Sequence, residues 1–409
     1  MEVVAHVLQL VGAACLLGTP AAGTGTRNPP AAAPVLRRTV LILGPLLVSA
    51  GLLLDALLTS AALTQSSLWS LDALTGVGAL VRSTSYGLVL LVRALSAAAL
   101  AAALAFAPTP AATIPSGGVR AAAAAAPAAV AAVVLALSLG AGGHAQTSTR
   151  PLLTVPAQGL HTALAAAWFG GLAQLAVLGL GTGDRAWLAR SVGRFSRFGL
   201  IAMLTVVASG VLLALTRVSS PYDLVETNYG LRLAAKLLWV GGVLGLAALN
   251  RFAIVPRLAG WPGGAAPAAL RLGLIVEALV GFGVVVLAGA LATTPPPLGP
   301  ADRYVVYLDE YRFEPAELTL RAGRVARVVV INRGETMHDW SVPTMPYAGG
   351  AVAGGDPHDH GENMIHVHVS PGGRGAIEFI PLRPGRYPLL CTVWPHAEEG
   401  MVGWVTVVE

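Results

Sequence analysis

The stretch Cys391-Thr-Val-Trp-Pro-His396-Ala-Glu-Glu-Gly-Met401, near the end of the chain, restricts the fold and its chemistry more than any other. Apolar residues alternate on both sides of it, which predicts a loop between two β-strands. A further histidine, His338, stands well upstream, after Asn332-Arg-Gly-Glu-Thr-Met. One thiol, two imidazoles and one thioether are soft donors, and three of the four would come from a single loop.

This donor set is typical of a mononuclear blue-copper site, where two histidines and a cysteine bind in a plane and a methionine binds weakly along the axis. The sequence therefore predicts copper as cofactor, with His338, Cys391, His396 and Met401 as its ligands. The alternative is a metal-free β-sandwich with a buried cysteine. The other cysteine, Cys15, lies in an apolar stretch, so a disulfide framework is excluded.

Residues 303–409 resemble the cupredoxins. The stretches FEPAELTLRAG, VVVINRGETMHDW and PGRYPLLCTVWPHAEEGMVGWVTV carry the resemblance. It implies an all-β sandwich whose copper ligands are the four residues given above, with Asn332 holding the ligand loop in place. The sequence departs from the family at Trp394-Pro395, where relatives often have Pro-Gly before the second histidine. That departure alters the surface beside the metal more than the ligands.

Further residues of metal-binding type lie between the predicted ligands. They are His358, His360, Met364, His366 and His368. If the last part of this segment is a strand, His366 and His368 share one face of it. A second, labile copper site is one interpretation, and a solvated polar loop that leads into a histidine-bearing strand is the other.

Upstream of this domain, the composition is that of a membrane protein. Hydrophobic residues make up 55% of the chain and charged residues only 11%, against about 25% charged in an average soluble domain. Residues 1–300 carry a net charge of +10 and residues 301–409 a net charge of −5. The basic residues are scattered between apolar stretches, which argues against a nucleic-acid partner. A proline-rich linker, 295–302, separates a membrane domain, 1–294, from the outer domain, 303–409.

The sequence predicts an α-helical membrane bundle of eight transmembrane helices, since a span needs about 20 apolar residues. The expected spans are 3–21, 39–63, 84–107, 120–141, 157–181, 198–216, 231–254 and 271–293. Most arginines fall in the loops after the first, third, fifth and seventh spans, which the positive-inside rule assigns to the cytoplasm. The N-terminus and the β domain are then extracytoplasmic, in a multi-pass protein of a bacterial-type inner membrane. A cleaved signal peptide over residues 1–22 is the alternative, although that segment lacks the basic start typical of signal peptides.

The bundle contains an internal similarity. Thr84-Ser-Tyr-Gly87, which opens one span, matches Thr227-Asn-Tyr-Gly230, and in both copies a cation, Arg93 or Lys236, stands nine residues after the threonine. We therefore expect two four-helix repeats in parallel, with a binding site at their interface. The alternative is a chance match in a leucine-rich sequence.

Polar residues within and beside the predicted spans are candidates for a transport path. Four ionisable side chains fall inside the spans, namely Asp55, Arg93, Lys236 and Glu277. They are either functional or form ion pairs that stabilise the bundle. Three histidines fall near the outer ends, His6, His144 and His161. They could bind copper, serve as axial haem ligands, or lie at the interface without a ligand.

Residues 144–297 resemble the copper-resistance D (CopD) family of inner-membrane proteins. The matching pieces are GHA at 143–145, LHTALAAAWFGGL at 160–172, RFSRFGL at 194–200, TNYGLRLAAKLL at 227–238, and the last span around Glu277, which ends in ATTPPP. Each motif is short, but their order together is specific. The resemblance implies copper handling across the cytoplasmic membrane.

Both parts of the chain therefore predict a protein of copper transport or homeostasis, with import as the direction that the family resemblance implies. The expected partners are the lipid bilayer, copper ions and an external copper carrier or redox protein. The alternative is a membrane-anchored blue-copper electron-transfer protein, and a copper sensor or store is a third interpretation. We expect no enzyme activity, because the sequence has neither a phosphate-binding glycine loop nor a nucleophile–base pairing.

Overall fold

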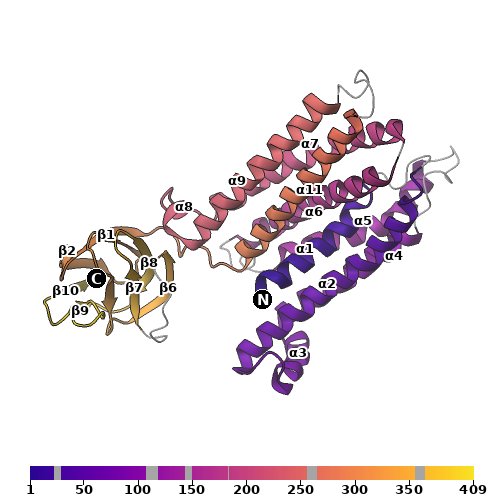
Figure 1. Cartoon of the computed structure of the whole chain (residues 1–409). Helices are drawn as coiled ribbons and strands as arrows, with labels where there is room; N and C mark the ends of the chain where they lie inside the picture. The colour runs from indigo at the N-terminus through magenta and orange to yellow at the C-terminus, as the bar shows by residue number, and fades with distance from the viewer. Residues whose placement is uncertain (23–28, 107–117, 143–149, 183, 256–264, 355–363) are drawn as a thin grey trace. The chain divides into compact units, whose positions relative to one another are not determined.

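The computed structural model describes residues 1–22, 29–106, 118–142, 150–182, 184–255, 265–354 and 364–409 (Figure 1). The chain divides into two compact units. One is helical and comprises Met1–Ala214 and Ala235–Thr293, and the other comprises Leu215–Ala234 and Thr294–Glu409. The second unit therefore contains a segment, 215–234, that the sequence analysis assigned to the membrane domain.

A helix overlaps each of the eight expected spans. The helices of the helical unit, with those that lead into the second unit, are α1 (Glu2–Gly18), α2 (Ala33–Thr64), α3 (Leu71–Ser83), α4 (Ser85–Phe106), α5 (Gly118–Gly140), α6 (Pro151–Gly181), α7 (Arg185–Leu215), α8 (Asp223–Glu226), α9 (Asn228–Leu249), the π-helix η2 (Asn250–Ile254) and α11 (Ala265–Ala292). Among the described residues, six helices are long and apolar enough to cross a membrane, while α1 and residues 125–140 of α5 are shorter. The chain thus has a multi-span helical region, and the count of eight spans stays a prediction.

Helix α1 packs closely against its neighbours because glycines face each other at the contacts. A Cβ on Gly170 of α6 would lie 1.8 Å from the carbonyl oxygen of Ala14. A Cβ on Gly12 would lie 2.6 Å from the carbonyl oxygen of Gly44 of α2. Small residues let helix backbones approach in this way where lipid provides no hydrophobic driving force.

The second unit is mainly a sandwich of two five-stranded sheets. The strands are β1 (Asp302–Asp309), β2 (Arg312–Glu314), β3 (Glu317–Arg321), β4 (Ala326–Asn332), β5 (His338–Val342), β6 (Tyr347–Gly354), β7 (Ile365–Val369), β8 (Arg374–Pro381), β9 (Gly385–Leu390) and β10 (Val402–Val408). The strand orders are β2-β1-β4-β8-β6 and β3-β10-β9-β5-β7. Inward residues of both sheets, such as Val328, Phe379, Trp340 and Val405, form one buried core. The expected all-β sandwich is thus present.

Helix α8 contributes two carboxylates to an ion cluster on the outer face of the first sheet. Arg303, Arg327 and Glu378 stand side by side on β1, β4 and β8. The Arg327 guanidinium lies 2.5 Å from the Asp223 carboxylate and 2.6 Å from that of Glu378. The Glu226 carboxylate accepts hydrogen bonds from Arg303, at 2.8 and 2.9 Å, and also from Arg374. This cluster is buried at Arg327 and at all three carboxylates, and it explains why segment 215–234 belongs to the β unit.

Candidate metal centre

His338 begins β5, and the loop before it is held by Asn332 at the end of β4. The Asn332 side chain donates hydrogen bonds to the carbonyl oxygens of Thr336 and Val369, both at 2.8 Å. Its own oxygen accepts the Gly334 N–H, also at 2.8 Å. The loop is therefore fixed to strand β7, and His338 points into the sandwich with 0% of its surface exposed.

The other three candidate ligands come from the loop between β9 and β10. The loop closes on itself, because the Cys391 N–H donates to the Met401 carbonyl (3.2 Å) and the Met401 N–H donates to the His396 carbonyl (2.9 Å). Cys391 and Met401 belong to the buried core of the sandwich, and His396 is 6% exposed. The spacing of residues 391–401 thus returns all three side chains to the end of the sandwich where His338 lies.

Two imidazole nitrogens and the thiol sulfur meet in one place. His338 Nδ1 lies 3.0 Å from His396 Nδ1, which lies 3.6 Å from Cys391 Sγ. Within the described residues, these three side chains form the group of histidines, cysteines and carboxylates close enough to hold a metal ion, with ligand atoms within 4.8 Å of one another. Soft, buried donors in this geometry fit copper. Met401 is fully buried beside them, and its axial role stays a prediction.

Burial sets the protonation of the metal-free site. It raises the pKa of the Cys391 thiol to about 12, and the neighbouring Asp339 carboxylate acts in the same direction against a hydrogen bond from the Asp339 N–H. Burial also lowers the pKa of His338, and the nearby His396 adds to this effect. At neutral pH the free site therefore holds a protonated thiol and a neutral His338 imidazole, so binding a metal at the sulfur requires loss of one proton.

Asp339 holds the ligand loop in place through hydrogen bonds, a role that the sequence analysis missed. Its N–H lies 3.4 Å from Cys391 Sγ. Its buried carboxylate accepts the Thr392 N–H at 2.5 Å and also the Thr392 hydroxyl. Asp339, which follows the ligand His338, is thus bonded to Thr392, which follows the ligand Cys391. Its place directly after His338 was the available sequence clue.

The turn between β1 and β2 packs over His396, a contact that the sequence analysis did not predict. Tyr311 has a positive φ of 58°, and its ring lies edge-on to His396, with centroids 5.3 Å apart. The Glu310 carboxylate accepts the N–H of Glu335 in the loop before His338. Trp394, within the ligand loop, is 81% exposed. The centre is thus shielded by Tyr311 and bordered by an exposed indole.

The second group of candidate ligands is only partly described, since His358 and His360 lie outside the described residues. His366 and His368 are both on β7, with ring centroids 5.4 Å apart. His368 Nδ1 lies 3.9 Å from the Asp339 carboxylate. Met364 Sδ accepts the Ser341 hydroxyl at 3.4 Å. Within the described part of the chain, these side chains do not converge as the first group does.

Two of the three membrane histidines lie in the described part of the chain, His6 on α1 and His161 on α6. His6 Nδ1 lies 3.1 Å from the Glu2 carbonyl on its own helix. His161 Nδ1 contacts α7, at 2.9 Å from the Val206 carbonyl and 3.1 Å from the Ser209 hydroxyl. His144 lies outside the described residues.

Contacts of three of the four intramembrane charges, Asp55, Arg93 and Glu277, are seen in the described structure. Gln9 bridges Asp55 and Arg93, since it donates to the Asp55 carboxylate (3.3 Å) and accepts from Arg93. Lys236 lies on α9. Glu277 of α11 accepts a hydrogen bond from Asn250 at 2.7 Å.

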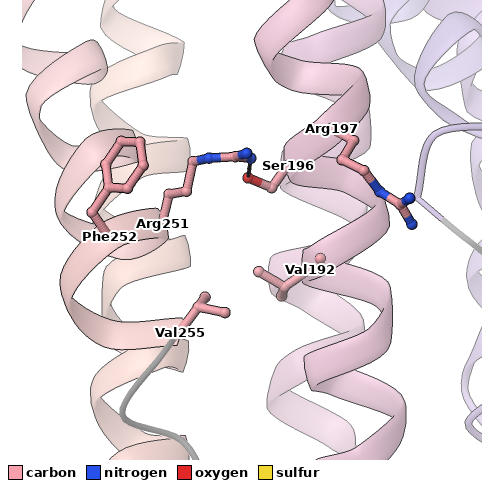
Figure 2. A pocket seen from close by; sticks show the side chains of 7 residues that line it. Val192, Ser196, Arg197, Arg251, Phe252 and Val255 are labelled. Atoms are coloured by element: carbon pink, nitrogen blue, oxygen red, sulfur yellow. Dashed lines mark hydrogen bonds between the residues drawn. The ribbon is translucent and has the colours of Figure 1, made fainter.

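A pocket of about 340 Å³ lies between α7 and η2 (Figure 2). Val192 and Val255 line it, and Arg251 reaches across to the Ser196 hydroxyl. It contains neither candidate histidines nor cysteines.

Parts of this chain are similar to known copper-resistance proteins. Residues 189–291 match the family model described as copper resistance protein D. A curated relative, the copper-resistant cuproprotein CopI of Rubrivivax gelatinosus, is 32% identical over 108 residues, which are 25% of this chain and 64% of that protein. The CopD resemblance predicted from the sequence is thus confirmed over α7, α9, η2 and most of α11. The chain spans less than two thirds of the curated relative's length.

Solved structures similar to this chain include blue copper proteins. Auracyanin B is 22% identical, with a TM-score of 0.22, and the match covers 29% of this chain and 94% of that one. The auracyanin of Roseiflexus castenholzii is 23% identical, with a TM-score of 0.22 over 27% of this chain and all of that one. Auracyanin A of Chloroflexus aurantiacus is 19% identical, with a TM-score of 0.21 and the same coverage.

Proposed function

We propose that this CopD-like chain transports copper or controls its level at a cytoplasmic membrane, and that its β unit binds copper on the extracytoplasmic side. The observation that carries the proposal is the meeting of two Nδ1 atoms and one thiol sulfur within 4.8 Å, in a chain whose membrane helices match a copper-resistance family. Bound copper would supply reversible one-electron exchange there. No catalytic turnover is assigned to the chain.

The chain's own residues would do three things in this function. His338, Cys391 and His396 bind copper, with Met401 as the weak fourth ligand. Asn332 and Asp339 fix the two loops, so that the donors are in place before the metal arrives. The outer histidines His6, His144 and His161 accept copper as cargo from the β unit or from an external carrier protein. The family resemblance favours import.

A specific observation favours electron transfer as the second candidate function. The four predicted ligands of the β unit are between 0% and 6% exposed. Such burial suits a resident metal whose ligands stay in place when its charge changes, whereas a cargo site has to exchange its ion. In that case the β unit is a redox centre, and the helices anchor it or bind a redox partner.

Uptake of copper into proteoliposomes distinguishes the two. The purified chain is compared with Cys391→Ser and with Cys15→Ser, which changes the cysteine outside the site. Transport predicts that the chain and Cys15→Ser move copper into the vesicles, and that Cys391→Ser does so more slowly. A chain that binds one copper with an intense visible band, yet moves none at any external concentration, would contradict the transport proposal and leave electron transfer.

The two cysteine variants also test the site itself. Cys391→Ser is expected to lose the visible band, and Cys15→Ser to keep it. If Cys391→Ser kept the band, the proposed ligand set would be wrong.

A further inference from the structure

Glu277 is a buried carboxyl group in a membrane-spanning helix, and the copper site does not use it. It is 4% exposed, and its Oε2 accepts a hydrogen bond of 2.7 Å from the side-chain amide of Asn250, which is 6% exposed. Within the described residues, Glu277 bonds to the Asn250 amide, and no cation acts on its carboxylate. A carboxylate buried in lipid surroundings without a cation is costly, and such residues usually have a function.

Asn250 meets this carboxyl group at a point where the helix changes from α-helical to π-helical. Asn250 begins the π-helix η2, directly after α9. π-Helical turns are rare and occur frequently at functional sites. On α11, Gly273 stands one turn before Glu277, on the same face. A Cβ on Gly273 would lie 2.2 Å from the Asn250 side-chain oxygen, so a larger residue there would require the amide to move from its present place. The π-helix on one side and Gly273 on the other thus allow the contact between the Asn250 amide and the Glu277 carboxyl.

The other titratable or charged groups on the packed elements are held elsewhere. Helix α11 packs against α1, α6 and η2. Arg251 of η2 points to Ser196 of α7 (Figure 2), and Arg271 of α11 itself donates to the Thr182 carbonyl. His161 of α6 contacts α7, as described above. The others on these elements are Glu2 and His6, at the start of α1, and Cys15.

Lys236, on the helix that continues into η2, precedes Asn250 by fourteen residues, which is about 21 Å of helix. Among the described residues, Asn250 is therefore the polar group that acts on Glu277.

We propose that Glu277 and Asn250 form a proton-binding site inside the membrane unit. A proton from water adds to the Glu277 carboxylate to give the neutral acid, and it returns to water when the acid ionises again. Asn250 stabilises the ionised form by its N–H. The ligand is a proton rather than copper because one carboxylate and one amide are hard donors, whereas copper(I) prefers sulfur and nitrogen. Coupling of this proton to copper movement would rest on the proposed function, but the site itself does not.

The first test uses dicyclohexylcarbodiimide, an apolar reagent that adds to protonated carboxyl groups, on the purified full chain. Mass mapping of α11 is expected to find the reagent on Glu277 at low pH. Above the midpoint, labelling should fall about tenfold per pH unit. The Glu277→Gln chain, which has no carboxyl group at this position, is the control and should take up no reagent there. Absence of label on Glu277 at every pH, or labelling that does not change with pH, would overturn the proposal.

Asn250→Leu makes the test specific. Without the amide N–H the ionised form is less stable, so the midpoint of labelling should move to higher pH. An unchanged midpoint would show that Asn250 plays no part and would overturn the pair. Glu277→Gln confirms the assignment of the labelled peptide. Both variants should keep the visible copper band, which reports the fold of the β unit independently.

The second test asks about coupling, in proteoliposomes with a pH difference across the membrane. Copper uptake by the wild-type chain should change with the direction of the gradient, and uptake by Glu277→Gln should not. If the wild-type chain moves no copper, the transport function fails, while the labelling result still decides whether the proton site exists. Uptake that responds to the gradient equally in both proteins would contradict the coupling.

Discussion

The metal centre depends on a residue that is not one of its ligands. Asp339 holds the ligand loop by accepting two hydrogen bonds from Thr392, and its carboxylate is fully buried. We predict that Asp339→Ala lowers the free energy of unfolding of the β unit by about 1–3 kcal/mol, because it removes the buried charged acceptor of two hydrogen bonds from Thr392. Urea unfolding followed by the copper band measures this.

The matched control for this variant is Asp302→Ala, which removes a carboxylate whose partner, Arg324, is largely exposed. It should change stability by no more than about 1 kcal/mol. Equal losses in the two variants would show that Asp339 has no special role.

Protonation of the buried thiol makes copper binding depend on pH. The pKa of Cys391 in the metal-free site is raised to about 12, chiefly by burial, so the thiol carries its proton throughout the neutral range. Copper binding should then release one proton from Cys391, and affinity should fall about tenfold for each unit by which the pH is lowered. Proton release measured in a weakly buffered titration tests this. Cys391→Ser should release none from this position, and equal release from both proteins would refute the assignment.

At the scale of the helices, sequence reasoning succeeded where a motif is local. The matched segments at Thr84 and Thr227 have the same structure: each threonine hydroxyl accepts the N–H of the glycine three residues later, at 2.9 Å in both cases. Each hydroxyl also donates to a carbonyl one turn earlier, of Leu80 or Asp223. The arrangement of the whole bundle as two four-helix repeats stays a prediction.

Sequence reasoning failed where partners are far apart in the chain. The ligand loop could be read from residues 391–401 because one hairpin loop supplies three donors. The ion cluster could not be predicted, because Asp223 and Arg327 are separated by 104 positions. Neither residue belongs to a local motif that indicates a partner. The contact of Tyr311 with His396 could not be predicted either, since it depends on the packing of a turn against a loop far along the chain.

The ion cluster gives a prediction for the strands it joins. Arg327→Leu should destabilise the β unit by about 3–5 kcal/mol, because it leaves the buried carboxylates of Asp223 and Glu378 without their cation. Hydrogen exchange should rise in β4, β8 and segment 215–234 together. Arg386→Ala is the control, because its ion pair with Glu317 is exposed, and it should cost no more than about 1 kcal/mol. Faster exchange confined to β4 would show that α8 is not held by this cluster.

At the scale of the whole molecule, the chain passes between the two units at three points, not only at the proline-rich linker. Segment 215–234 leaves the end of α7, joins the β unit through α8, and returns into α9. A fragment that begins at the proline-rich linker would therefore lack Asp223 and Glu226 and leave Arg327 without two of its acidic neighbours. Copper binding and stability are properties to measure on the full chain.

The arrangement of the chain across the membrane gives the last prediction. Helix α1 has 17 residues, or about 26 Å, close to the roughly 30 Å of a bilayer core. If α1 and α5 both cross, there are eight spans and the two chain ends lie on the same side. With the arginine-rich loops in the cytoplasm, a cysteine placed at Ser67, between α2 and α3, should react with a membrane-impermeant maleimide on intact cells. One placed at Arg190, near the start of α7, should react only after the cells are opened. Labelling of Arg190→Cys on intact cells would place the start of α7 outside and contradict this topology.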